Sequence, residues 1–311
     1  LDGAARSRRA GARVGLSRRA ATDGPSGVCV VDKPGGWTSH DVVARARRLL
    51  GTRRVGHAGT LDPMATGVLV LGVGRATRLL TYITGVDKTY EATIRFGTET
   101  DTLDAEGEVV ARHDMDAPDP EAVRAAAASL TGTIQQVPPM VSAVQVGGRR
   151  LHELAREGIE VEREPRTVVV HRFELEPTED PMVWRAVVEC SSGTYVRSLA
   201  AELGRALGGG AHLASLRRTA VGPFTLEEAR PLEELELLPP AEAVRHLPRA
   251  VVDDDAAARL RHGRFLDPAR VGLEGDGPWA VLDRSGSLVA VCRSQDGMAR
   301  PAVVLPAEAG E

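Results

Sequence analysis

The chain has 311 residues, of which 42% are hydrophobic and 26% are charged, and its formal net charge is −4. This composition is that of a globular protein long enough for a large core domain and a smaller second one. It excludes a protein that binds nucleic acid through strong overall positive charge, and no apolar run approaches the roughly 18 residues of a membrane span.

The N-terminal segment, residues 1–24, carries six arginines among many Ala and Gly residues and shows little periodicity. It lacks the apolar core of a secretory signal. We therefore predict a disordered extension and exclude it from the fold.

Residues 27–50 predict a strand followed by a helix. The apolar run Gly27–Val31 is typical of a buried strand. Thr38 or Ser39 can cap the helix, and five apolar residues share the face that we expect against the core: Val42, Val43, Ala46, Leu49 and Leu50.

The stretch from Gly56 to Gly67 combines one carboxylate, one imidazole and three glycines, and the apolar run 68–73 after it predicts a buried strand. Pro63 fixes its own φ and biases Asp62 toward an extended conformation. Asp62 is then either a reactive carboxylate on a stiff loop or the start of an ordinary turn. Local chemistry alone favours the turn.

The middle of the chain alternates strands and helices. Residues 98–107 have the oxygen density of a calcium loop without the spacing of one, so we predict a polar loop there. The other elements expected are a helix at 76–83, a strand at 89–96, a helix at 121–130 capped by Asp119, a strand at 131–137, paired strands at 168–175 and 183–190, a helix at 195–207 and a strand at 213–219.

Past about Pro239 the pattern changes to short apolar runs separated by Gly and Asp turns. These predict a small β unit. Its expected elements are a short helix within 250–266 and strands near Val271 and at 279–282, 288–292 and 302–305.

Basic side chains gather in two segments. Residues 45–54 hold five arginines and no acid, and residues 203–218 hold Arg205, Arg217, Arg218 and His212, again with no acid. Two such segments beside a loop suit a phosphate backbone, although a solvated helix face gives the same pattern.

Cysteine and histidine usage bears on compartment and cofactors. Cys29, Cys190 and Cys292 are far apart and odd in number, which predicts reduced structural thiols in a cytoplasmic protein. The histidines show no metal-ligand spacing, and no nucleotide-binding glycine motif is present. We expect no metal and no cofactor.

Four separated motifs carry a resemblance to a known family. Asp32–Ser39, Gly56–Gly67, Asp87–Glu91 and Ser192–Arg197 occur in this order. Together they closely resemble the TruB family of tRNA pseudouridine synthases, over residues 27–218.

The resemblance implies an α+β fold, with a mixed, mainly antiparallel sheet and peripheral helices, followed by a small C-terminal PUA-like β domain. It places the catalytic domain at 25–245, with an RNA-covering insertion at 138–166, and the RNA-binding PUA-like domain at 246–311. In the insertion, the pair Gly147–Gly148 suggests a hinge. The family usually has Lys where Gln145 stands and Tyr where His152 stands, so the roles of these two stay open.

The implied reaction is isomerisation of uridine 55 in the T-arm loop of tRNA to pseudouridine. The base is flipped out of the RNA, and Asp62 is the catalytic nucleophile. Whether Asp62 attacks C1′, adds to C6 or first abstracts a sugar proton stays open. The resemblance further implies a cytoplasmic monomer with tRNA as its partner, no obligatory protein partner and no membrane.

Several side chains take roles through the same resemblance. Arg197 would pair with Asp62 and keep it ionised by lowering its pKa. Tyr90 would stack on the uracil and assist removal of the C5 proton. The remaining candidates are Tyr195 and Leu216 as pocket walls, and Lys33 as a loop support or backbone contact. His57 would fill the space left by the flipped nucleotide or contact RNA, and a general base is the other option for it.

Two other functions share some of these features. One is a synthase of the archaeal and eukaryotic box H/ACA type, which works with a guide RNA and partner proteins. The other is a non-catalytic RNA-binding protein that keeps the cleft. The insertion and the short C-terminal unit favour the stand-alone enzyme, and the joint presence of Asp62, Tyr90 and Arg197 disfavours lost activity.

Overall fold

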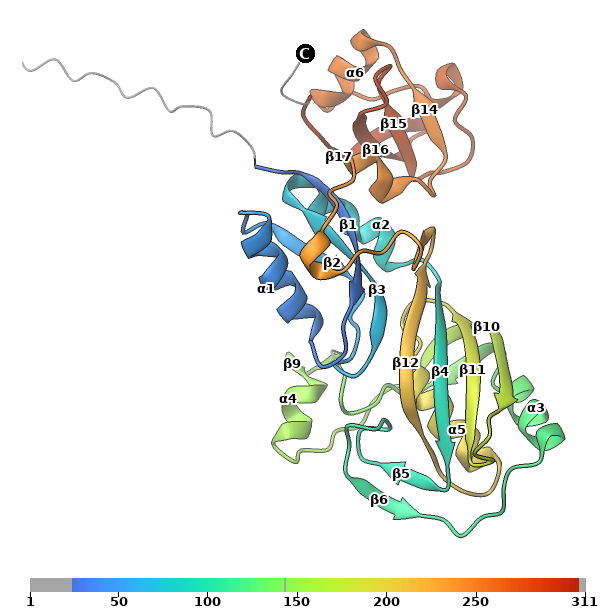
Figure 1. The fold of residues 1–311 in the computed structure, drawn as a ribbon. Helices are drawn as coiled ribbons and strands as arrows, with labels where there is room; N and C mark the ends of the chain where they lie inside the picture. Colours follow the sequence, from blue (N-terminus) through green and yellow to red (C-terminus); the bar gives the residue numbers. More distant parts are fainter. Residues whose placement is uncertain (1–23, 143, 308–311) are drawn as a thin grey trace, which may run out of the picture.

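The computed structural model describes residues 24–142 and 144–307. The expected N-terminal extension, apart from Gly24, therefore lies outside the described residues. Within the described ranges the chain forms two main sheets, a large one in the middle of the molecule and a small C-terminal one at one end (Figure 1).

The large sheet has nine strands in the described residues, in the order β1-β3-β12-β4-β11-β10-β7, with β2 paired to β3 and β13 to β12. Every pairing is antiparallel except β12 with β3. This confirms the mixed, mainly antiparallel sheet. Its strands are β1 (Gly27–Lys33), β2 (Val55–Ala58), β3 (Thr66–Val73), β4 (Lys88–Phe96), β7 (Gly132–Gln136), β10 (Arg166–Pro177), β11 (Val183–Cys190), β12 (Ala211–Val221) and β13 (Phe224–Thr225).

The parallel pairing of β12 with β3 joins the two halves of this sheet and is short. It consists of Arg217 opposite Thr66 and Arg218 opposite Gly67. Gly67 has a φ of +99°, and a Cβ added there would lie 2.2 Å from the Arg218 carbonyl oxygen. Only glycine therefore fits where the two halves meet.

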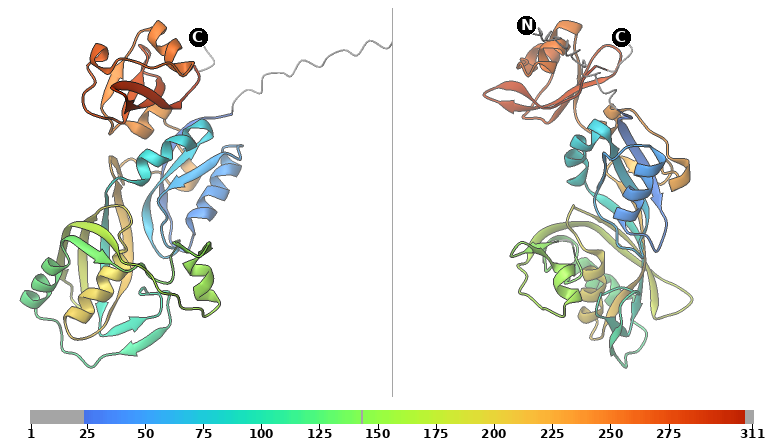
Figure 2. Two further views of the ribbon diagram at one scale, coloured as in Figure 1. Left: turned by 180° about the vertical axis from the view of Figure 1, so that it is seen from behind. Right: turned by 90° about the vertical axis from the view of Figure 1, so that its left-hand side faces the viewer.

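Helices cover the sheet on different sides of this junction. Helix α1 (Ser39–Leu49) packs on β1 and β3, and α3 (Pro120–Ser129) and α5 (Val196–Ala206) pack on β4, β10, β11 and β12 (Figure 2). The 3₁₀ segment η1 (Gly74–Leu79) runs into α2 (Leu80–Thr84) on the other face of β3.

The predicted cap of α1 is confirmed, because Thr38 and Asp41 form a reciprocal capping box. One predicted core residue of this helix is wrong. Leu49 is 42% exposed, since in the last turn it is Leu50 that packs against the core cluster.

The segments expected as polar or hinged contain small hairpins. Within 98–112, β5 (Thr98–Thr100) pairs with β6 (Val109–Arg112), so the predicted loop is partly a strand. Strands β8 (Gln145–Val146) and β9 (Arg149–Arg150) precede α4 (Leu151–Arg156). Gly147 and Gly148 both have positive φ and form the two-residue turn of that hairpin, so their conformation serves a hairpin turn.

The C-terminal sheet has the order β14 (Arg249–Val251), β15 (Trp279–Leu282), β16 (Leu288–Gln295), β17 (Met298–Val304), with α6 (Asp254–Arg261) against it. The predicted small β unit is confirmed. The strand expected near Val271 is wrong: this residue ends the 3₁₀ segment η4 (Pro268–Val271), which Asp267 caps and Gly272 terminates in a left-handed conformation.

An apolar cluster joins the two sheets. It contains Val68, Tyr82 and Phe224 from the first part and Leu282 and Val291 from the second. The connecting segments η2 (Leu232–Glu234) and η3 (Pro240–Val244) return along β1, where Leu238 and Val28 exchange backbone hydrogen bonds. The C-terminal sheet is thus packed on the first part through a shared core.

Two further findings concern the described residues only. None of their helices is long and apolar enough to cross a membrane. No group of three or more His, Cys, Asp or Glu side chains among them is arranged to hold a metal ion.

Candidate active site

The loop between β2 and β3 carries Asp62, and three side chains from elsewhere hold its backbone. Lys33 donates to the Pro63 carbonyl at 3.2 Å, and the Ser39 hydroxyl accepts from the Leu61 amide at 2.9 Å. Arg218 donates to the carbonyls that precede Asp62. The loop is therefore fixed by the body of the protein, as a positioned reactive group requires.

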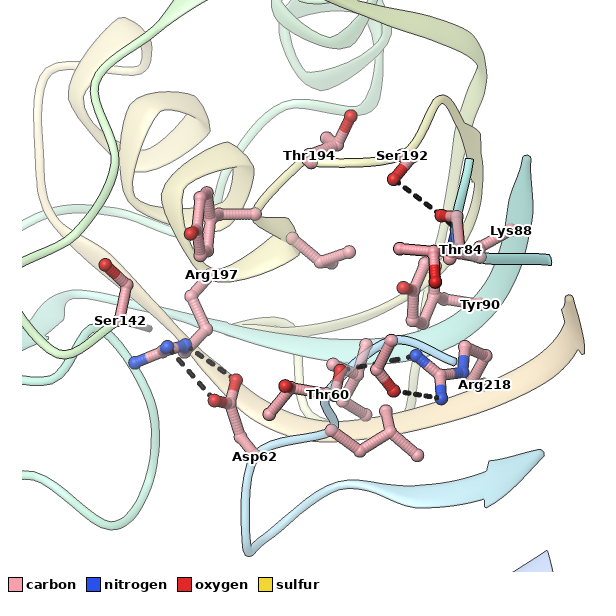
Figure 3. A pocket seen from close by; sticks show the side chains of 16 residues that line it. Thr60, Asp62, Thr84, Lys88, Tyr90, Ser142, Ser192, Thr194, Arg197 and Arg218 are labelled. Carbon is pink, nitrogen blue, oxygen red and sulfur yellow. Dashed lines mark hydrogen bonds and ion pairs between the residues drawn. The ribbon is translucent and has the colours of Figure 1, made fainter. Parts of the chain in front are cut away.

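The Asp62 carboxylate pairs with a guanidinium from the other half of the sheet. Arg197 Nε lies 3.0 Å from one carboxylate oxygen, and Nη2 donates to the other at 3.2 Å (Figure 3). The backbone of this residue does form a turn, because the Ala65 amide donates to the Asp62 carbonyl. The side chain, however, faces Arg197, so the turn and the positioned carboxylate coexist.

Arg197 contacts two carboxylates and two backbone carbonyls. Besides its contacts with Asp62, Nη1 donates to the Thr102 carbonyl at 2.9 Å and lies 3.4 Å from the Asp104 carboxylate, and Nη2 also donates to the Val141 carbonyl at 2.8 Å. The side chain is only 3% exposed. Its orientation is therefore fully determined, and it is not the surface residue that its place at a helix start would suggest.

Asp104 belongs to this network and was not identified from the sequence. Its side chain is 4% exposed and accepts from the Thr102 hydroxyl at 2.7 Å and from the Glu106 amide at 3.1 Å. Asp104 lies in the acidic loop expected to be polar and solvated. The density of oxygen atoms in that loop was the available signal, but nothing in the spacing marked which carboxylate is buried.

The protonation of Asp62 depends on opposing effects. Burial raises the pKa of its carboxyl above the usual value, Arg197 lowers it, and Asp104 raises it further. The net direction is upward. The expected net lowering is thus wrong, because withdrawal from water disfavours the charged form more than the guanidinium favours it.

Asp62 opens into a cavity of about 220 Å³ between the two halves of the sheet (Figure 3). Tyr90 from β4 and Tyr195 at the start of α5 line it, together with Leu216 from β12. Burial raises the pKa of the Tyr90 hydroxyl, while Arg218 beside it acts in the opposite direction. The cavity therefore joins one carboxylate to aromatic and apolar walls.

Lys33 and His57 lie outside the residues that line this cavity. The Lys33 side chain is fully buried, and its three N–H groups donate to the carbonyls of Pro34, Trp37 and Pro63. These bonds suit the loop-supporting alternative predicted for Lys33. His57 packs edge-on against His40, and no contact in the structure tests its RNA-binding role.

The two basic segments differ in exposure. Arg47, Arg48, Arg53 and Arg54 are exposed, as a phosphate-binding face requires. The second segment does not offer such a face: Arg218 is 1% and His212 7% exposed. Arg218 serves the cavity, Arg217 pairs with Asp32 at 2.8 Å, and of the four basic residues in this segment only Arg205 is exposed.

Two further cavity residues were missed by the sequence analysis. Lys88 stands two positions before Tyr90, so the alternation of β4 places both on one buried face. That spacing was a usable signal. Arg218, in contrast, looked like one more cation of a basic segment.

Comparison with known proteins gives three family models that follow one another along the chain. "TruB family pseudouridylate synthase (N terminal domain)" matches residues 47–196. "tRNA pseudouridylate synthase B C-terminal domain" matches 197–251, and "tRNA Pseudouridine synthase II, C terminal" matches 247–306.

Similar whole proteins point the same way. The tRNA pseudouridine synthase B of Arthrobacter sp. (strain FB24) is 52% identical over 294 residues, which cover 90% of this chain and 96% of the relative. The protein of the same name from Thermobifida fusca (strain YX) is 50% identical over 290 residues, covering 89% and 98%.

Among solved structures, a Cbf5–Nop10–Gar1 complex contains a chain with a TM-score of 0.68 and 27% identity, covering 90% of this chain and 84% of its own. An H/ACA RNP bound to a substrate RNA containing 2′-deoxyuridine gives a TM-score of 0.68 and 25% identity, with coverages of 91% and 86%.

Proposed function

The chain belongs to the TruB family of tRNA pseudouridine synthases, and from this premise we propose that it isomerises uridine 55 in the T-arm loop of tRNA to pseudouridine. Asp62 is the catalytic nucleophile, and the reaction uses neither metal nor cofactor. The observation that carries the proposal is the position of the Asp62 carboxylate. Arg197 places one nitrogen on each of its oxygens, at the wall of a cavity lined by Tyr90 and Tyr195.

The reaction has three requirements. The bond from C1′ to N1 must break, the detached uracil must turn inside a closed space, and its C5 must lose a proton after joining C1′. The Asp62 carboxylate supplies the nucleophile or base near the sugar. The cavity walls supply a platform for a base pulled out of its stack, with Leu216 excluding water.

The two-point contact between Arg197 and the Asp62 carboxylate supports a nucleophilic role for Asp62. Two donors fix the plane of the carboxylate, and this removes the freedom that an unpaired aspartate would have to lose on reaching the transition state. The positive charge also favours ionisation of a group whose pKa burial raises. Tyr90 stacks on the uracil, and its hydroxyl, buried and protonated at neutral pH, assists the proton transfer at C5.

The RNA needs a binding surface larger than this cavity. The exposed arginines in the last turn of α1 and directly after it suit the phosphates of the T-arm stem. The insertion at 138–166 begins at the cavity, because the Val141 carbonyl binds Arg197 and Ser142 lines the wall. We assign residues 25–245 to the catalytic domain and 246–311 to a PUA-like domain that adds RNA affinity, in a cytoplasmic monomer without an obligatory protein partner.

The main rival is a guide-RNA-dependent synthase, to which the fold is also similar. The far higher identity to stand-alone tRNA enzymes, over nearly the whole chain, favours the tRNA substrate. The test is incubation of the purified protein alone with an unmodified tRNA transcript, followed by mapping of pseudouridine by chemical modification. A matched transcript with cytidine at position 55 is the control.

The expected result is one pseudouridine at position 55 without added guide RNA or protein. A product at another position would overturn the site assignment. A requirement for a guide RNA or a protein partner would favour the rival enzyme.

A further inference from the structure

Two buried cations line the cavity without a carboxylate partner. Lys88 is 6% and Arg218 1% exposed, and within residues 24–142 and 144–307 neither forms an ion pair with Asp or Glu. Arg197, on the same cavity wall, differs because it contacts two carboxylates. Lys33 is also buried and forms no ion pair in the described part of the chain, but it lies outside the cavity lining and serves the loop. A buried, unpaired charge is costly, so this arrangement calls for an explanation.

The hydrogen bonds of both side chains go to backbone carbonyls. Arg218 donates to the carbonyls of Val68, Thr60 and Gly59 at 2.8, 3.3 and 3.1 Å. Lys88 donates to the carbonyl of Thr84 at 2.9 Å and to that of Val86 at 2.5 Å. Its third N–H group has no partner among the described residues. Carbonyl dipoles orient the two cations but leave their full positive charge.

The two cations lie at the opposite side of the cavity from Asp62, with Tyr90 beside them (Figure 3). The largest charge effects on the pKa of the Asp62 carboxyl come from Arg197, Asp104 and Lys33. The cavity therefore has a carboxylate side and a cationic side, and a flipped uridine with its ribose at Asp62 places its base toward the cationic side.

The chemistry of the proposed reaction puts negative charge on that base. When C1′–N1 breaks, the electron pair stays on N1 and the uracil becomes an anion. C1′ then gains either a bond to an Asp62 oxygen or a double bond to C2′, whose proton passes to Asp62. If Asp62 adds to C6 instead, the charge moves through C5 to O4. All three routes make the pyrimidine ring anionic.

We propose that Lys88 and Arg218 form a cationic wall that binds the uracil ring in its anionic state and stabilises the charge that develops on it. This rests on the proposed function. Fixed positive charge in a water-poor site is worth most where charge develops during the reaction, which explains why these two cations have no resident anion.

Lys88 is the better residue for a test, because Arg218 also holds the loop before Asp62. We compare Lys88→Met with Arg95→Met, which removes a positive charge from the same strand but from an exposed pair with Asp180. The measurement is the single-turnover conversion of uridine 55 at saturating tRNA. Lys88→Met should lose roughly 100-fold and Arg95→Met less than about 3-fold, with tRNA affinity similar in both.

A second substrate separates charge stabilisation from a structural role. Fluorine at C5 withdraws electrons, so a ring anion of 5-fluorouracil needs less help from the protein. For tRNA with 5-fluorouridine at position 55, the first-turnover loss in Lys88→Met should shrink to below about 10-fold. An equal loss with both substrates would assign Lys88 to folding or positioning, and no loss would refute the proposal.

The unmodified enzyme gives a check that does not depend on the variant folding. Burial, and then Arg218, lower the pKa of Lys88 to about 8; the other groups facing it are Cys190 from β11 and Asp87, which is exposed and pairs with His171. The wild-type rate should therefore fall above about pH 8 as the ammonium loses its proton. A rate that stays flat well above that pH would overturn the proposal.

The fall must also disappear in Lys88→Met. Burial lowers the pKa of Lys33 to about 8 as well. A fall that persists unchanged in the variant would belong to Lys33 or another group and would contradict the assignment. Failure of the wild-type protein to form pseudouridine at all would instead refute the proposed function.

Discussion

The two sides of the cavity hold their charges in different ways. At Asp62 a guanidinium lies between two carboxylates, so each charge has an opposite neighbour. Lys88 and Arg218 donate to backbone carbonyls and, within the described residues, pair with no carboxylate. The first arrangement fixes geometry before substrate arrives, and the second leaves charge available for a group that arrives with the substrate.

The largest effect is expected on the carboxylate side, where Asp62→Asn removes the charge and the nucleophile. An amide keeps the shape and one acceptor, so the protein should fold and bind tRNA while its rate falls by at least about 10³-fold. Single-turnover pseudouridine formation and a tRNA binding curve measure the two quantities separately.

A matched control for this variant is Asp32→Asn. Asp32 also pairs with an arginine, Arg217, but lies outside the cavity lining. We expect it to keep most of the activity. Equal losses in the two variants, or loss of tRNA binding with Asp62→Asn, would mean that Asp62 has a structural role.

The second prediction concerns the geometry of the pair. Arg197→Lys keeps the positive charge, but three donors on a point charge cannot replace five in a planar fork. We expect about a 10²-fold loss in kcat with little change in tRNA affinity. Arg217→Lys is the matched control, because its guanidinium binds Asp32 and Thr66 away from the cavity. An unfolded Arg197→Lys, seen by thermal unfolding, would show that stability depends on this residue.

The difference between the two sides also explains what the sequence could predict. The strands and helices followed from apolar periodicity, as in β4, where Lys88, Tyr90, Ala92, Ile94 and Phe96 share the buried face. Asp62, Tyr90, Tyr195 and Arg197 came from short motifs that can be recognised in the sequence, and Leu216 came from the family resemblance outside those motifs. The resemblance assigned roles to these residues but none to Lys88, although Lys88 stands in the same motif as Tyr90.

The remaining site residues depend on long-range pairing that no local pattern contains. Asp104 meets Arg197 because the loop after β5 pairs with Leu213 of β12, and Arg218 reaches the Asp62 loop because β12 runs parallel to β3 over two residues. From local composition alone, Asp104 and Arg218 were indistinguishable from solvent-exposed charged residues. Both side chains are buried in the folded protein, and their burial depends on strand pairing between segments far apart in the sequence.

The smallest effect on rate is expected for Asp104→Asn, and the direction in which this variant shifts the pH–rate profile tests the carboxylate side of the cavity. Asp104→Asn removes the second carboxylate beside Arg197, yet the amide oxygen can still accept from Thr102 and Glu106. We expect roughly a 10-fold loss at neutral pH, because Arg197 loses a charged acceptor that orients it.

The acidic limb of the pH–rate profile should move in Asp104→Asn, and the direction follows from the charges. Asp104 raises the pKa of Asp62, so its removal lowers that pKa, and the ionised nucleophile survives to lower pH. Weakening the guanidinium with Arg197→Lys should move the same limb toward higher pH. Asp101→Asn, an exposed carboxylate of the same loop that binds only the Glu108 amide, should move nothing. If Asp104→Asn and Arg197→Lys shifted the limb in the same direction, the three charges would not act on one another as the geometry indicates, and the contrast with the cationic side would fail.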